Sequence, residues 1–356
     1  MTQTDQHAKN DLRIQKALRV ALTLLASYGI LVGVGASPVQ AYSVTPVRPD
    51  LSYWNRSMQA DIPFQHGTNI SSVDTTDAPP VNDDTSTVWC SNPIGRIITD
   101  TLTSNVLAQD LPVNVYLPPC YDGSRFDYPT LYLIQGSGFV QGEWIVDGAT
   151  RLADLQMSLG MLAPFIIVMP ANDLNSGDSG VYINSSGGAG SWEDFIVNDL
   201  VPYIDTKYST WNDRRGRAIG GISRGGYWSL QIAFSHPDLF TVVGGHSPAI
   251  ASMFLNGVGD GFSMLSMAKS IDSMKTLRIF LDAGDQDEMQ PGMLQLAEEL
   301  LQHGIPYAKS IGTGIHDDRY WSSRMSDYLT FYAADWPMVA RTKSQATWQQ
   351  SFYRFQ

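Results

Sequence analysis

The sequence predicts an α/β fold with a mostly parallel central sheet, an antiparallel N-terminal hairpin and helices on both faces. Short, continuous apolar runs at 130–134 and 165–169 are typical of central strands covered on both sides. Two earlier segments, 96–103 and 113–117, alternate between apolar and polar residues, as half-buried antiparallel strands do. Helical patterns fall between the apolar runs. This alternation indicates a parallel sheet whose sites lie at the carboxyl ends of its strands.

The composition agrees with one main globular core. Of the 356 residues, 43% are hydrophobic and 16% are charged, which is ordinary for a folded α/β domain with extensions. Further strands are expected at 218–219, 242–244 and 277–281, and helices at 148–159, 192–208, 225–236 and 292–303.

The first 41 residues have the order of a secretory signal peptide. Four Lys or Arg residues lie within the first 19 positions, an apolar stretch follows to about Gly35, and the small-residue pattern Val39-Gln40-Ala41 ends it. We expect cleavage after Ala41 and a secreted protein with no stable membrane insertion after that cleavage. An uncleaved membrane anchor is the alternative, because the apolar stretch is only slightly short of a bilayer span.

Residues 42–88 are rich in Ser, Thr, Asp, Asn and Pro, which predicts a polar linker or extended arm before a main domain at 89–356. The formal net charge is -12, and no basic run occurs after the first twenty residues. Nucleic acid is therefore not an expected partner, because a phosphate backbone is bound through clustered Lys and Arg.

The two cysteines of the chain, Cys90 and Cys120, flank the predicted hairpin. Export would place them where disulfides persist, so one interpretation is a bridge and the other is two separate buried thiols. The scattered histidines and these two cysteines show no zinc spacing, and no metal or organic cofactor is expected.

The strongest local signal is Gly221-Ile222-Ser223-Arg224-Gly225, which places Gly-x-Ser-x-Gly between a predicted strand and a predicted helix. A Ser on such a sharp turn has a strained backbone, and glycines are needed where a β-carbon would collide with neighbouring elements. The motif alone occurs in many glycine-rich loops. Its position between strand and helix predicts Ser223 as a nucleophile.

A serine nucleophile needs a base and an orienting carboxylate, which follow it in the chain in this fold. Among six histidines His316 is the candidate base, because it lies in a loop before the last predicted helix. His246 ends a strand and is a candidate for lining the pocket. Asp287 is the candidate acid and Asp285 the alternative, whereas Asp282 should point into the sheet packing.

Two backbone amides are expected to stabilise an oxyanion. The Arg224 amide follows the nucleophile at a helix N-terminus, and the Ser137 amide lies in a small-residue loop after the strand at 130–134. A plain glycine turn is the alternative reading of that loop.

Six segments carry a resemblance to a known family. They are Val-Tyr-Leu-Pro-Pro-Cys-Tyr at 115–121, Leu-Tyr-Leu-Ile-Gln-Gly at 131–136, Asp-Leu-Val-Pro-Tyr-Ile-Asp at 199–205, the nucleophile segment at 219–226, His-Pro-Asp-Leu-Phe at 236–240 and His-Asp-Asp-Arg-Tyr-Trp at 316–321. Together they resemble the putative esterase family of α/β-hydrolases, which includes feruloyl and acetylxylan esterases, siderophore esterases, S-formylglutathione hydrolase and the mycobacterial mycolyltransferases. The resemblance covers about 96–334. It implies Ser223 as nucleophile, His316 as base and an Asp at 285–287 as acid.

Two positions depart from the family pattern. Many relatives have His where this chain has Gln135, and Met or Gln where it has Arg224. Neither change removes a backbone amide, so the expected oxyanion donors remain.

The resemblance implies a serine esterase that hydrolyses small-molecule or polysaccharide-linked carboxylic esters through an acyl-enzyme. An extracellular acyltransferase of the mycolyltransferase type is the alternative, because it would use the same triad. A further alternative is a non-catalytic binding domain on a hydrolase scaffold. The ester, the acyl chain length and the oligomeric state are not indicated by the sequence.

Overall fold

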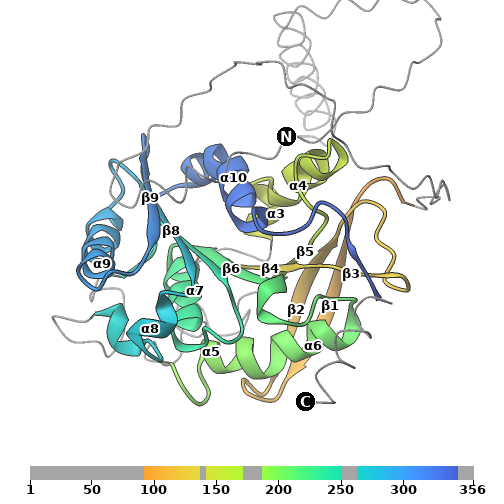
Figure 1. Cartoon of the computed structure of the whole chain (residues 1–356), viewed down its shortest axis with the longest axis horizontal. Helices are drawn as coiled ribbons and strands as arrows, with labels where there is room; N and C mark the ends of the chain where they lie inside the picture. The colour runs from red at the N-terminus through yellow and green to blue at the C-terminus, as the bar shows by residue number, and fades with distance from the viewer. Residues whose placement is uncertain (1–91, 137–141, 171–186, 251–262, 344–356) are drawn as a thin grey trace, which may run out of the picture. The chain divides into compact units, whose positions relative to one another are not determined.

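A computed structural model describes residues 92–136, 142–170, 187–250 and 263–343 (Figure 1). The expected signal peptide at 1–41 and linker at 42–88 lie outside these described residues, so both stay predictions. No helix within the described ranges combines the length and the apolar character needed to cross a bilayer.

The core of the described chain is an eight-stranded sheet in the order β1-β2-β5-β4-β6-β7-β8-β9. β2 pairs antiparallel with both β1 and β5, and every pair from β5 through β4 to β9 is parallel. A separate pair joins β3 to β10. The strands are β1 Arg96–Ser104, β2 Gln109–Leu117, β3 Phe126–Asp127, β4 Thr130–Ile134, β5 Ile166–Pro170, β6 Arg217–Ile222, β7 Val242–His246, β8 Arg278–Gly284, β9 Tyr307–Gly312 and β10 Arg341–Thr342.

Helices cover both faces of this sheet and bury a separate apolar cluster on each. α3, α4 and α10 pack on one face, whereas α5, α6, α7 and α9 contribute to the cluster on the other (Figure 1). The helices are α3 Glu143–Val146, α4 Ala149–Ser158, α5 Trp192–Phe195, α6 Val201–Lys207, α7 Arg224–Ser235, α8 Ile271–Met274, α9 Gln290–Gln302 and α10 Asp318–Ala333, with a π-helical turn at Ile196–Leu200 and 3-10 turns at Arg214–Gly216 and Met264–Met267.

The strand order places the candidate residues along one edge of the sheet. From β4 the chain adds β5 on one side and then β6, β7, β8 and β9 on the other, so the strand order reverses between β4 and β6. Ligands of open α/β sheets bind at this kind of switch point, outside the carboxyl ends of the strands. Ser223 follows β6 directly, and the loops after β8 and β9 carry Asp287 and His316.

The sequence prediction of the fold is confirmed: the sheet is mostly parallel, begins with an antiparallel hairpin and has helices on both faces. Three details differ. β9 was not predicted, because this edge strand is only partly buried and carries Lys309 and Ser310 where a central strand would be apolar. β2 begins at Gln109 rather than at 113, ahead of Pro112. The helix expected at 192–208 is interrupted by a π-helical turn.

Cys120 is disulfide-bonded. The other cysteine of the sequence, Cys90, lies outside the described residues.

Candidate active site

Ser223 occupies a sharp turn between β6 and α7. Its backbone has φ 56° and ψ -120°, a positive-φ conformation that costs free energy in a residue with a β-carbon. The turn is fixed to the next strand, because the Ser223 backbone N–H donates to the His246 carbonyl at 2.9 Å. The residue is 8% exposed and lies at the wall of a cavity.

The two glycines of the motif make room for this turn. A β-carbon on Gly221 would lie 2.2 Å from a backbone atom of Gly225. A β-carbon on Gly225 would lie 2.2 Å from the Ile134 carbonyl oxygen at the end of β4. Any larger residue would force the strand and the helix apart, as the sequence predicted.

His316 links the nucleophile to a carboxylate. Its Nε2 lies 3.0 Å from Ser223 Oγ, and its Nδ1 lies 2.9 Å from Asp287 Oδ1. The Trp321 ring packs edge-on against the imidazole, with 5.0 Å between the ring centroids. The indole N–H of Trp321 in turn donates to Ser247 Oγ at 3.1 Å. The imidazole is thus held by hydrogen bonds at both nitrogens and by an aromatic contact.

Asp287 lies in an environment that favours its charged form. Its side chain is fully buried, and burial acts to raise its pKa. Hydrogen bonds from His316, Ser247 and the Met289 backbone N–H outweigh burial and hold the pKa below its usual value. A buried carboxylate that stays charged can orient an imidazole and stabilise its protonated form.

Asp285 does a different task, since it joins two loops. Its Oδ1 accepts the Gly314 backbone N–H at 3.0 Å, and its own N–H donates to the Gly312 carbonyl at 2.7 Å. The Gln286 N–H donates to the Gly314 carbonyl at 2.9 Å. Asp285, the alternative acid of the sequence analysis, therefore ties the loop after β8 to the loop that carries His316.

His246 does not line the pocket. It is fully buried, and its Nδ1 and Nε2 face Asp282 Oδ1 at 2.5 Å and the Tyr332 hydroxyl at 2.8 Å. Asp282 points into the same core, as expected from its position on the strand. It accepts hydrogen bonds from the Tyr320 and Tyr328 hydroxyls.

The cavity beside Ser223 has a volume of about 540 Å³. Arg224 and Met289 line it together with His316, and so do two acidic residues that the sequence reasoning missed, Glu143 and Asp318. The sequence gives no sign that Glu143 and Asp318 line a cavity, because acidic residues at helix starts are common on protein surfaces. Ser137, the expected second oxyanion donor, lies outside the described residues.

The fold and this arrangement define an α/β-hydrolase. A serine on a strained strand-to-helix turn meets a histidine and a carboxylate from later loops, in the chain order that this fold uses. The model of the putative esterase family matches residues 104–332, more than half of the chain, and the chain belongs to this family.

Several known proteins are similar in sequence. Esterase Rv1288 of Mycobacterium tuberculosis is 30% identical over 245 residues, which cover 57% of this chain and 52% of the relative. An endo-1,4-beta-xylanase/feruloyl esterase of Xylanibacter ruminicola is 30% identical over 200 residues, covering 51% of this chain and 27% of that protein. The chain thus spans about half, or less, of the length of these curated relatives.

Solved structures share the fold. A ferulic acid esterase superposes with a TM-score of 0.59 at 24% identity, over 68% of this chain and 99% of that one. An S-formylglutathione hydrolase from Staphylococcus aureus gives a TM-score of 0.55 at 18% identity, over 68% of this chain and 98% of that one. At this level of identity the likeness concerns the fold.

Proposed function

We propose that the chain is a secreted serine esterase whose catalytic triad is Ser223, His316 and Asp287. The observation that carries the proposal is the continuous chain of hydrogen bonds from a hydroxyl at a cavity wall, through an imidazole, to a buried carboxylate. A strained serine backbone costs free energy that the rest of the fold has to offset. A purely structural hydrogen-bond network therefore seldom includes one.

The mechanism is acyl transfer in two steps. His316 Nε2 takes the proton of Ser223 Oγ as that oxygen attacks the ester carbonyl, and Asp287 stabilises the resulting imidazolium. The tetrahedral oxyanion accepts hydrogen bonds from the Arg224 amide and, in our proposal, from the Ser137 amide. His316 then gives its proton to the leaving alcohol. Water, deprotonated by the same imidazole, attacks the acyl-enzyme; the bond to Ser223 Oγ breaks, His316 returns the proton to that oxygen, and the acid is released.

The substrate class that we propose is a carboxylic ester, either small or attached to a polysaccharide. Feruloyl esterases occur both among the sequence relatives and among the structures with this fold. A cavity of about 540 Å³ is in the range that accommodates an acyl group of aromatic size. The signal sequence expected at 1–41 would deliver the enzyme to such substrates outside the cell.

A fluorophosphonate probe tests the nucleophile directly, because it reacts with activated serines. Peptide mapping of the labelled protein is expected to find the adduct on Ser223, and Ser223→Ala should not be labelled. An adduct on another serine would show that the assignment is wrong. Hydrolysis of methyl ferulate and of p-nitrophenyl esters, with and without an added sugar acceptor, then separates hydrolysis from acyl transfer by the product formed.

A further inference from the structure

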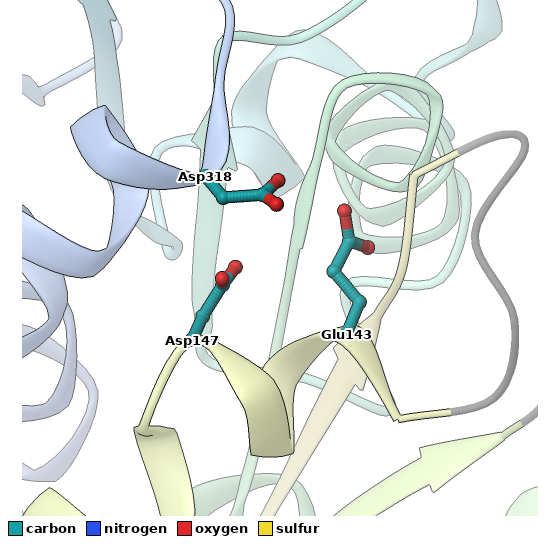
Figure 2. Close-up of side chains that lie close together, drawn as sticks. All are labelled: Glu143, Asp147 and Asp318. Atoms are coloured by element: carbon teal, nitrogen blue, oxygen red, sulfur yellow. The ribbon is translucent and has the colours of Figure 1, made fainter. Parts of the chain in front are cut away.

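Three carboxylates converge beside the proposed nucleophile, outside the triad. Glu143 begins α3, Asp147 follows the end of that helix, and Asp318 begins α10. One oxygen of each lies within 4.8 Å of the others, and Figure 2 shows the three side chains pointing toward a common space. We call Glu143, Asp147 and Asp318 the acidic cluster.

The protein itself does little to neutralise this cluster. Glu143 is 3% exposed and Asp147 is 6% exposed. Glu143 Oε1 and Asp147 Oδ2 are buried without a hydrogen-bond partner. Within the described part of the chain, no Lys, Arg or His forms an ion pair with any of the three.

Among the described residues, two hydrogen bonds from outside the cluster reach these carboxylates. The Gly136 N–H donates to Glu143 Oε2 at 2.7 Å, and the Ser322 hydroxyl donates to Asp147 Oδ1 at 3.3 Å. Buried carboxylates of this kind repel, and each loses the water that would stabilise its charge.

We propose that the acidic cluster binds a divalent cation of the Ca²⁺ type. Hard cations take carboxylate oxygens as ligands and keep water in the remaining positions. Three carboxylates supply the charge, and the cavity supplies access for water, because Glu143 and Asp318 form part of its wall. The unpartnered oxygens of Glu143 and Asp147 are the ligand atoms that this arrangement offers.

Protons compete with the cation for the same oxygens. Burial, the largest cause, raises the pKa of Glu143 to about 8, and the charges of Asp147 and Asp318 act in the same direction. Burial likewise raises the pKa of Asp147 to about 6. Binding is therefore tested at about pH 9, since ligand carboxylates must be deprotonated.

The site adjoins the loop after β4. Through its Oε2, Glu143 holds the Gly136 N–H, one residue before the proposed oxyanion donor Ser137. A β-carbon on Gly136 would lie 3.5 Å from the Ser223 β-carbon. A cation that fixes Glu143 would thus fix the backbone beside the nucleophile.

Binding can be measured without a substrate, so its outcome is separate from that of the esterase assay. The EDTA-treated full chain is titrated at about pH 9 with Tb³⁺, whose luminescence under tryptophan excitation reports a bound ion, and with Ca²⁺ while Tm is recorded. We expect saturable binding of Ca²⁺ with a Kd of about 10⁻⁴ M. Tm should rise by about 5 °C when Ca²⁺ exceeds that Kd about 100-fold.

Variants locate the site. Glu143→Gln and Asp147→Asn should each lose both responses while retaining the circular dichroism of the folded chain, because each removes an uncompensated buried charge. Asp272→Asn, at a side chain that is 91% exposed, and Glu288→Gln, at a cavity residue outside the acidic cluster, should keep both responses. The proposal is wrong if the wild-type chain shows no saturable response, or if the Glu143→Gln and Asp147→Asn double variant retains it.

Discussion

Two histidine–aspartate pairs lie at neighbouring positions in this fold and have almost the same hydrogen-bond pattern. In each, Nδ1 faces a carboxylate and Nε2 faces a hydroxyl. His316 has Asp287 and Ser223 as partners, at 2.9 and 3.0 Å. His246 has Asp282 and Tyr332, at 2.5 and 2.8 Å.

The two pairs differ in what surrounds the hydroxyl. Tyr332 is fully buried, and burial followed by the Asp282 charge raises the pKa of its hydroxyl well above the usual value. The His246 ring also stacks on Tyr328, with 3.6 Å between the centroids. Ser223 instead stands on a strained turn at the wall of a cavity. An imidazole hydrogen-bonded to a carboxylate therefore does not by itself distinguish the two pairs. What distinguishes the pair at Ser223 is a hydroxyl that faces a cavity from a strained backbone turn.

The largest expected effect is at the hydroxyl that opens to the cavity. Ser223→Ala should lower kcat by about a million-fold while leaving the unfolding transition in urea close to that of the wild type, because only a nucleophile is lost. Steady-state hydrolysis of a p-nitrophenyl ester measures the first quantity and circular dichroism the second. Turnover that persists in this variant would assign the chemistry elsewhere.

Next comes the carboxylate of the same pair. Asp287→Asn should lower kcat by about ten-thousand-fold, because the charge that stabilises the imidazolium is lost. Asp285→Asn is the matched control, and we expect it to stay within about ten-fold of the wild type, since an amide oxygen can still accept the Gly314 N–H. The reverse order of the two variants would move the triad acid to Asp285.

The buried pair should respond in stability. Asp282→Asn removes the negative charge that faces His246 in a fully buried site. Breaking such a pair lowers the free energy of unfolding by about 3–5 kcal/mol. Urea unfolding measures the loss, and kcat per folded molecule should change by less than about ten-fold. A loss of activity as large as that of Asp287→Asn, at unchanged stability, would show that the two pairs are not distinct in role.

The smallest effect is expected at Tyr332. Tyr332→Phe removes the hydroxyl that faces His246 Nε2 and should lower the free energy of unfolding by about 1 kcal/mol. The space left behind is that of a single oxygen atom, which lies beside Gly220 and Gly244. A loss above about 3 kcal/mol would indicate that the hydrogen bond orders the whole pair.

Local patterns explain why the residues of the first pair could be named from the sequence. Gly221 and Gly225 bracket Ser223 in a short motif, and His316 lies in a glycine-rich loop late in the chain. The second pair gives no such signal. His246 meets Asp282 only because β7 and β8 are neighbours in a register that sets these two residues side by side.

The acidic cluster escaped prediction for a similar reason. Glu143 begins the short helix α3 and Asp147 directly follows it, but Asp318 comes from α10, far along the chain. Their convergence depends on α3 and α10 covering the same face of the sheet, which the alternation of strands and helices does not specify. Whether a carboxylate is solvated or buried without a donor is a property of that packing.

The hydrogen bond from the Ser223 amide to the His246 carbonyl ties the strained turn to a fully buried residue at the end of β7. The Ala249 amide donates to the Ser223 carbonyl at 3.0 Å, so the backbone of the turn is held on both sides. Local fraying should not release such a proton. In hydrogen exchange the Ser223 amide is expected to be among the slowest in the chain, exchanging only when the whole domain unfolds. Heat should accordingly abolish activity and native structure in a single event.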